Sequence, residues 1–101
     1  MCFKRFQRYR KNWRTLRRAV DEFGKDCENW PYQELDRHAT EIPVVARIVD
    51  GVKFEFDIEC WEKKANGDLR ISINIGGLPT ILGAKPAYDF VKRADGSVYY
   101  P

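Results

Sequence analysis

The segment VKFEFDIECW, residues 52–61, decides the fold, because its apolar and charged side chains alternate without a break from Val52 to Cys60. Alternation with a period of two predicts a β-strand that buries one face and exposes the other. The apolar even-numbered positions predict the face that packs on the core. The odd-numbered positions, from Lys53 to Trp61, predict an outer face in contact with water.

A second alternating segment, LRISINI at residues 69–75, predicts the neighbouring strand. Pairing Cys60 with Leu69 across a turn at residues 63–67 brings the two apolar faces together. The same register sets Glu59 opposite Arg70 on the outer face, and a cross-strand pair of opposite charges is favourable. Residues 88–93 and 97–100 predict a last hairpin around residues 94–96.

The dipeptide Asp50-Gly51 predicts a hairpin in front of the first of these strands. A two-residue turn would set Arg47 opposite Phe54 on the buried face. A three-residue loop, residues 49–51, instead pairs Ala46 with Phe54 and makes every neighbouring pair apolar as well. We therefore expect the three-residue loop.

Residues 1–24 predict one long, basic, amphipathic helix. Apolar residues recur at spacings of four and three, which is one face of a helix; they are Cys2, Phe6, Tyr9, Trp13, Leu16, Val20 and Phe23. Gly24 follows the last of them and predicts the end of the helix. Residues 1–20 carry eight cations and no acid, although the whole chain has a formal charge of only +3.

A short helix is expected at residues 30–39, because Pro31 suits its first turn. The chain then enters a sheet that extends from residue 42 to residue 100. The expected fold is a single α+β domain, residues 1–101, with both helices packed on a four- or five-stranded antiparallel meander. This element order resembles the cystatin-like and NTF2-like topologies. The resemblance rests on no sequence motif and implies nothing about function.

Length and composition exclude several classes of protein. A chain of 101 residues, 44% of them hydrophobic, is the size of one globular domain. Its apolar runs are too short to span a bilayer. Three cysteines form no even set of disulfides, and the Arg-rich start does not resemble a secretory signal. We expect a cytoplasmic protein of bacterial or phage type.

Catalytic and metal-binding patterns are weak. His38 is the single histidine, so a nucleophilic pair would need Cys27 or Cys60 to come close to it. Cys2, Cys27, His38 and Cys60 lack the paired spacing of a zinc site, and Gly76-Gly77 lacks the rest of a phosphate-binding motif. We expect no enzyme, no cofactor and no metal.

Two charged surfaces are the candidate binding sites. The first is the basic helix, through Lys4, Arg5, Arg8, Arg10, Lys11, Arg14, Arg17 and Arg18. The second is the outer sheet face, through Glu55, Asp57, Glu59, Trp61 and Arg70. An exposed tryptophan among charges is a common anchor for a partner protein. The apolar loop at residues 76–87 is expected to cap the core, and the alternative is that it forms an apolar recognition patch.

These features favour a small non-enzymatic binding protein, of inhibitor, immunity or adaptor type, that occupies the surface of a partner protein. A nucleic-acid-binding accessory protein that uses the Arg-rich helix is the alternative. A small-molecule pocket or an enzyme site between helix and sheet is the second alternative, in which the aromatic stripe would line a cavity. A membrane surface is the least favoured partner, and the oligomeric state is left open.

Overall fold

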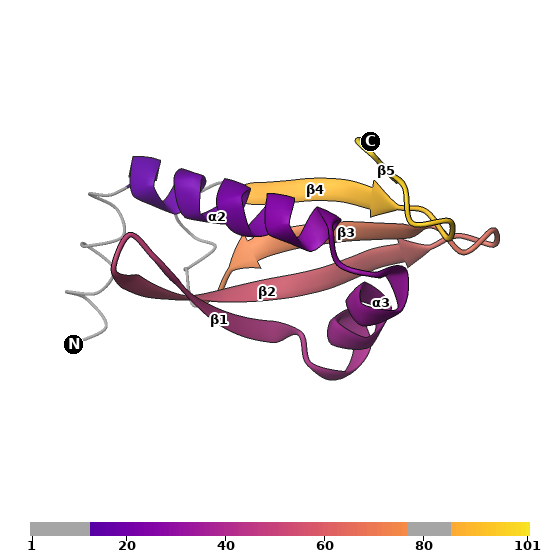
Figure 1. The fold of residues 1–101 in the computed structure, drawn as a ribbon, viewed down its shortest axis with the longest axis horizontal. Helices are drawn as coiled ribbons and strands as arrows, with labels where there is room; N and C mark the ends of the chain where they lie inside the picture. Colours follow the sequence, from indigo (N-terminus) through magenta and orange to yellow (C-terminus); the bar gives the residue numbers. More distant parts are fainter. Residues whose placement is uncertain (1–12, 77–85) are drawn as a thin grey trace.

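A computed structural model of the chain describes residues 13–76 and 86–101 (Figure 1). Two helices come first, α2 (Trp13–Glu28) and α3 (Tyr32–Glu41). Five strands follow, β1 (Val44–Val49), β2 (Val52–Lys63), β3 (Leu69–Ile75), β4 (Ala87–Lys92) and β5 (Val98–Tyr99). The part of the N-terminal segment before Trp13 and most of the loop expected to cap the core lie outside the described residues.

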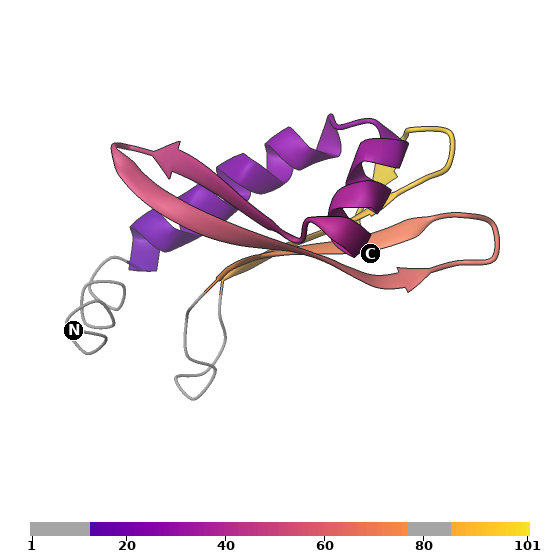
Figure 2. The ribbon, with the colours of Figure 1, turned by 90° about the horizontal axis from the view of Figure 1, so that it is seen from below.

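The strands form one antiparallel sheet in the order β1-β2-β3-β4-β5, so each strand pairs with its neighbours in sequence. Both described helices lie on one face of this sheet, the inner face (Figures 1 and 2). Helix α2 lies against β3 and β4, and α3 lies against β2. The expected α+β fold, with helices followed by an antiparallel meander, is confirmed.

The core lies between the helices and the inner face. Phe54, Phe56 and Ile58 of β2 are buried, as the alternation predicts. The ring of Phe23 on α2 stacks on Phe56, with centroids 4.5 Å apart and planes at 19°. Burying one side chain of this size stabilises the fold by roughly 1.5–3 kcal/mol.

Helix α2 continues past Gly24 to Glu28, so the predicted end at Gly24 was wrong. Gly24 is buried under the ring of Tyr88 from β4, where a Cβ would collide with the ring. The glycine therefore allows a close approach between helix and sheet and does not end the helix. Helix α3 follows Pro31 as predicted, and it extends to Glu41, two residues beyond the predicted end.

The predicted register between β1 and β2 was also wrong. Val49 pairs with Val52 across a two-residue turn, and Arg47 lies opposite Phe54. Asp50 and Gly51 have φ values of 51° and 77°. Positive φ at both turn residues is typical of a type I′ turn, whose twist matches that of the flanking strands. This turn geometry fixes the register, and the fully apolar pairing does not form.

The shift of one residue inverts the two faces of β1. Arg47 lies on the inner face, with its guanidinium 5.5 Å from the centroid of the Phe23 ring, an arrangement that attracts a cation to the aromatic face. Arg47 is therefore absent from the outer face, where the three-residue loop would have placed it. Val44 and Ile48 lie on the outer face instead, with 49% and 75% of their surface exposed.

The pairing of β2 with β3 keeps the predicted faces and changes the predicted partners. Cys60 lies opposite Ile71, and the register then shifts between Cys60 and Glu62. This bulge places Glu62 opposite Arg70, so the predicted pair of Glu59 with Arg70 was wrong. The last hairpin forms as predicted, with Gly96 at a φ of 92° in its turn.

Candidate functional site

The described part of the basic helix is electrically balanced. Helix α2 carries four cations, Arg14, Arg17, Arg18 and Lys25, and four acids, Asp21, Glu22, Asp26 and Glu28. The excess positive charge of the N-terminal region is concentrated in residues 1–12, which hold five cations and no acid. Those five, Lys4, Arg5, Arg8, Arg10 and Lys11, lie outside the described residues.

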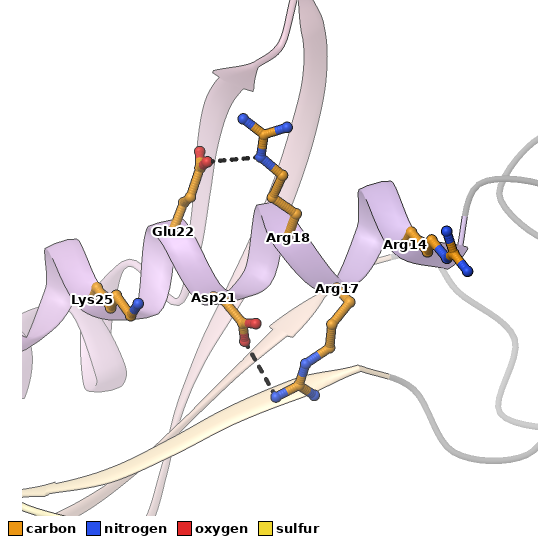
Figure 3. A pocket seen from close by; sticks show the side chains of 6 residues that line it. All are labelled: Arg14, Arg17, Arg18, Asp21, Glu22 and Lys25. Atoms are coloured by element: carbon orange, nitrogen blue, oxygen red, sulfur yellow. Dashed lines mark hydrogen bonds and ion pairs between the residues drawn. The ribbon is translucent and has the colours of Figure 1, made fainter.

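Two of the arginines on α2 are engaged within the protein (Figure 3). Arg17 forms an ion pair with Asp21 at 3.2 Å. Arg18 donates from Nε to Glu22 at 3.1 Å, and its Nη1 lies 3.4 Å from Asp50 in the β1–β2 turn. The bond to Glu22, with Asp50 adding to it, raises the pKa of Arg18. Exposed pairs of this kind contribute little to stability, but they occupy groups that a phosphate would need.

An open depression of about 500 Å³ lies on this face of α2. It is lined by Arg14, Arg17, Arg18, Asp21, Glu22 and Lys25. Figure 3 shows side chains of both signs along this part of the helix. A mixed lining favours neither a phosphate backbone nor a single-signed partner surface.

The second surface is the outer face of the sheet, which neither described helix covers (Figure 2). Glu55, Asp57 and Glu59 follow one another along this side of β2, as the alternation predicts. We call these three residues the acidic row. It gives the middle of the face a negative charge.

Trp61 lies at the end of the acidic row, in the bulge of β2 between Cys60 and Glu62. Trp61 is largely exposed, with 63% of its surface accessible to solvent. The indole Nε1 donates to Glu59 Oε2 at 3.0 Å. The guanidinium of Arg70, on β3, lies 5.8 Å from the centroid of the Trp61 ring. The indole is therefore in contact with two neighbours, and Trp61 links three of the five residues expected on this surface.

In the described part of the chain, neither Cys27 nor Cys60 is hydrogen-bonded to His38. Cys27 is fully buried in α2, and burial raises the pKa of its thiol to about 12, with Asp26 adding to the effect. Burial also raises the pKa of Cys60. His38 lies in the last turn of α3. Its Nδ1 lies 3.1 Å from the carbonyl oxygen of Ile42, and its Nε2 lies 3.8 Å from Glu34.

A polar cluster at the end of α2 was not predicted from the sequence. The Glu28 carboxylate accepts hydrogen bonds from the hydroxyls of Tyr88 and Tyr100. The buried Lys92 donates to the carbonyl oxygen of Glu28 at 2.7 Å, which places a cation at the negative end of the helix. No sequence pattern joins residues that lie 60 to 72 positions apart. The cluster fastens α2 to β4 and to the segment after β5.

Within residues 13–76 and 86–101, no three of the histidine, cysteine, aspartate and glutamate side chains come together as a metal site. No helix in the described part of the chain is long and apolar enough to cross a membrane. Comparison with known proteins returned no match to any family model, to any curated protein or to any solved structure.

Proposed function

We propose that this chain is a small, non-enzymatic binding protein, of inhibitor, immunity or adaptor type, and that it occupies the surface of a partner protein with the outer face of its sheet. The observation that carries the proposal is Trp61. A large aromatic side chain is exposed on a charged face and is held by Glu59 and Arg70. Aromatic anchors that need no reordering are the residues that dominate protein interfaces.

The charge balance of α2 supports the outer face over the helix as the binding surface. Arg17 and Arg18 already have acidic partners within the chain. The acidic row places three carboxylate side chains of one sign along one side of a single strand. Such a row attracts a basic surface and speeds its approach.

The expected partner surface is basic, with an apolar recess that receives an indole ring. Arginine or lysine side chains on the partner would face the exposed Glu55. The apolar recess of the partner would lie beside them and cover Trp61. The interior of the fold supports this choice over a small-molecule site, since Phe23 and Phe56 stack directly on each other between helix and sheet.

Affinity capture from the native cell tests the proposal, with nuclease present and with three baits beside the wild type. Trp61→Ala removes the anchor and Glu59→Lys reverses a charge of the acidic row. Glu41→Lys makes the same charge reversal at an exposed position on α3 and serves as the matched control. We expect a protein that the wild type and Glu41→Lys retain and that both other variants lose. Equal retention by all baits contradicts the proposal.

The nucleic-acid alternative rests on the five cations of residues 1–12. In the same experiment, nucleic-acid binding would appear as captured nucleic acid that nuclease removes and that salt releases. For each phosphate contacted, log K falls with log salt at a slope of about −0.9. Reversal of Arg5, Arg8 and Arg10 to Glu would abolish that binding, whereas Trp61→Ala would leave it unchanged.

A further inference from the structure

β1 forms one edge of the sheet, and its outward backbone groups are available for pairing. Val49 pairs with Val52 at the turn, and the carbonyl oxygen of Pro43 accepts from Ile58 N at 2.7 Å. The backbone N–H and C=O groups of the odd-numbered residues of β1 therefore point toward β2. In an antiparallel ladder the residues between them direct N–H and C=O to the other side. These residues are Val44, Ala46 and Ile48.

No backbone group in the described part of the chain pairs with these three residues. Figure 2 looks onto this edge, because β1 is the lowest strand of the sheet in Figure 1. Natural sheets protect exposed edges with lysine, proline, a bulge or a covering segment. Val44, Ala46 and Ile48 place only apolar side chains on the outer face there, and two of them are largely exposed.

We propose that β1 pairs with β1 of a second copy of this chain, antiparallel, around a two-fold axis at Ala46. This register sets Ala46 against Ala46 of the second copy. It also sets each Val44 against the Ile48 of the other copy. All three outward residues of β1 then gain backbone partners, and every exposed apolar side chain of the strand gains an apolar neighbour.

The sequence of β1 favours its own copy over an unrelated strand, because its pattern is complementary to itself when reversed. Val, Ala and Ile at two-residue spacing read as a large, a small and a large side chain in either direction. Isologous pairing around a two-fold axis is the commonest way in which soluble chains associate. A shift toward Ile42 is disfavoured, because the N–H of Ile42 is bound to the carbonyl of His38.

Charges do not oppose this arrangement. The acidic row lies on β2, so the two rows of a pair are separated by both β1 strands, a distance of about 14 Å at the usual strand spacing. On the inner face, each Arg47 lies opposite Val45 of the other copy. Arg47 Nη1 donates to the carbonyl oxygen of Ala46 at 3.0 Å, and pairing replaces this exposed bond with backbone bonds between the two Ala46 residues.

Sedimentation of the full chain over a wide concentration range tests the association. We expect a monomer–dimer equilibrium that Ile48→Lys weakens about tenfold or more, because it removes two cross-strand contacts and places lysine on the edge. Asp89→Lys introduces lysine at an exposed outer-face position on β4 and is the matched control. A wild type that stays monomeric throughout, or an equal effect of both variants, overturns the proposal.

Cross-linking tests the register. In a background with Cys2 and Cys60 replaced by serine, Ala46→Cys places two thiols on adjacent backbones, within reach of a disulfide. Ile48→Cys places them four residues out of register, beyond that reach. We expect mild oxidation to give a covalent dimer with Ala46→Cys and a monomer with Ile48→Cys. The reverse result, or no difference, overturns the two-fold axis at Ala46. The test does not depend on the proposed partner protein.

Discussion

Tyr88 packs its ring against the backbone of Gly24, so that a Cβ on Gly24 would overlap the ring and lie 2.8 Å from the Cβ of Tyr88. This contact brings β4 and α2 close together. Glycine in a helix interior is less favourable than alanine by about 0.8–1 kcal/mol. The helix accepts that penalty here because no other residue leaves room for the ring.

Gly24→Ala is therefore expected to destabilise the protein by about 1–3 kcal/mol despite the better helix propensity of alanine. Denaturant unfolding measures the change. Lys25→Ala, an exposed substitution at the next position, is the control. In a Tyr88→Ala background the penalty of Gly24→Ala is expected to shrink. A stabilised Gly24→Ala protein would show that the ring does not restrict this position.

Phe56→Ala is expected to lower the free energy of unfolding by about 3–5 kcal/mol. Phe56 is fully buried in the middle of β2 and stacks on Phe23. Glu55→Ala, at the adjacent exposed position, is expected to change stability by less than about 0.5 kcal/mol. Thermal melting of the two variants side by side gives the comparison, and similar melting temperatures would contradict the assignment of the two faces.

The thiol of Cys27 is expected to be unreactive toward a disulfide reagent at neutral pH while the protein is folded. Its pKa of about 12 keeps it protonated, and no part of the residue is exposed. Reagent kinetics on a Cys2→Ser, Cys60→Ser variant isolate this thiol. We expect one equivalent of thiol to react only after denaturation. Rapid labelling of the native protein would refute this prediction.

The polar cluster at Glu28 is expected to make stability fall in alkaline solution. Burial, then the hydrogen bond to Glu28, raises the pKa of Tyr88 above its ordinary value of 10.0. The folded state therefore keeps a proton that the unfolded state releases as the pH rises past about 10, and the balance moves toward unfolding. Tyr88→Phe removes this titration. Its unfolding free energy is expected to decline less steeply above pH 10 than that of the wild type.

Local patterns in the sequence were sufficient for most of the fold. Alternation assigned the correct faces to β2 and β3, since burial of Phe54, Phe56 and Ile58 follows directly from side-chain direction in a strand. The same alternation placed Glu55, Asp57, Glu59 and Trp61 on one outer surface. These features depend on neighbours two positions apart, which a sequence records explicitly.

The wrong predictions involve competition between local geometry and distant contacts. The type I′ turn at Asp50-Gly51 overrode the apolar pairing of β1. Arg47 is accommodated at the edge of the inner face, where it remains exposed and lies near the ring of Phe23. Gly24 was read as a helix end because Tyr88 is 64 residues away. The contact of Arg70 with Trp61 depends on a bulge that has no sequence pattern.

The meander order of the strands and the late position of β4 have a consequence for synthesis of the chain on the ribosome. Each hairpin from β1 to β3 joins residues that emerge one after another, so these strands can pair while translation continues. Helix α2 emerges before all of them, yet the residues that bind its C-terminal end, Tyr88, Lys92 and Tyr100, follow β3 in the chain. Docking of α2 is thus completed only after β4 and Tyr100 have been translated. Until then its apolar stripe is open to chaperones that bind nascent chains.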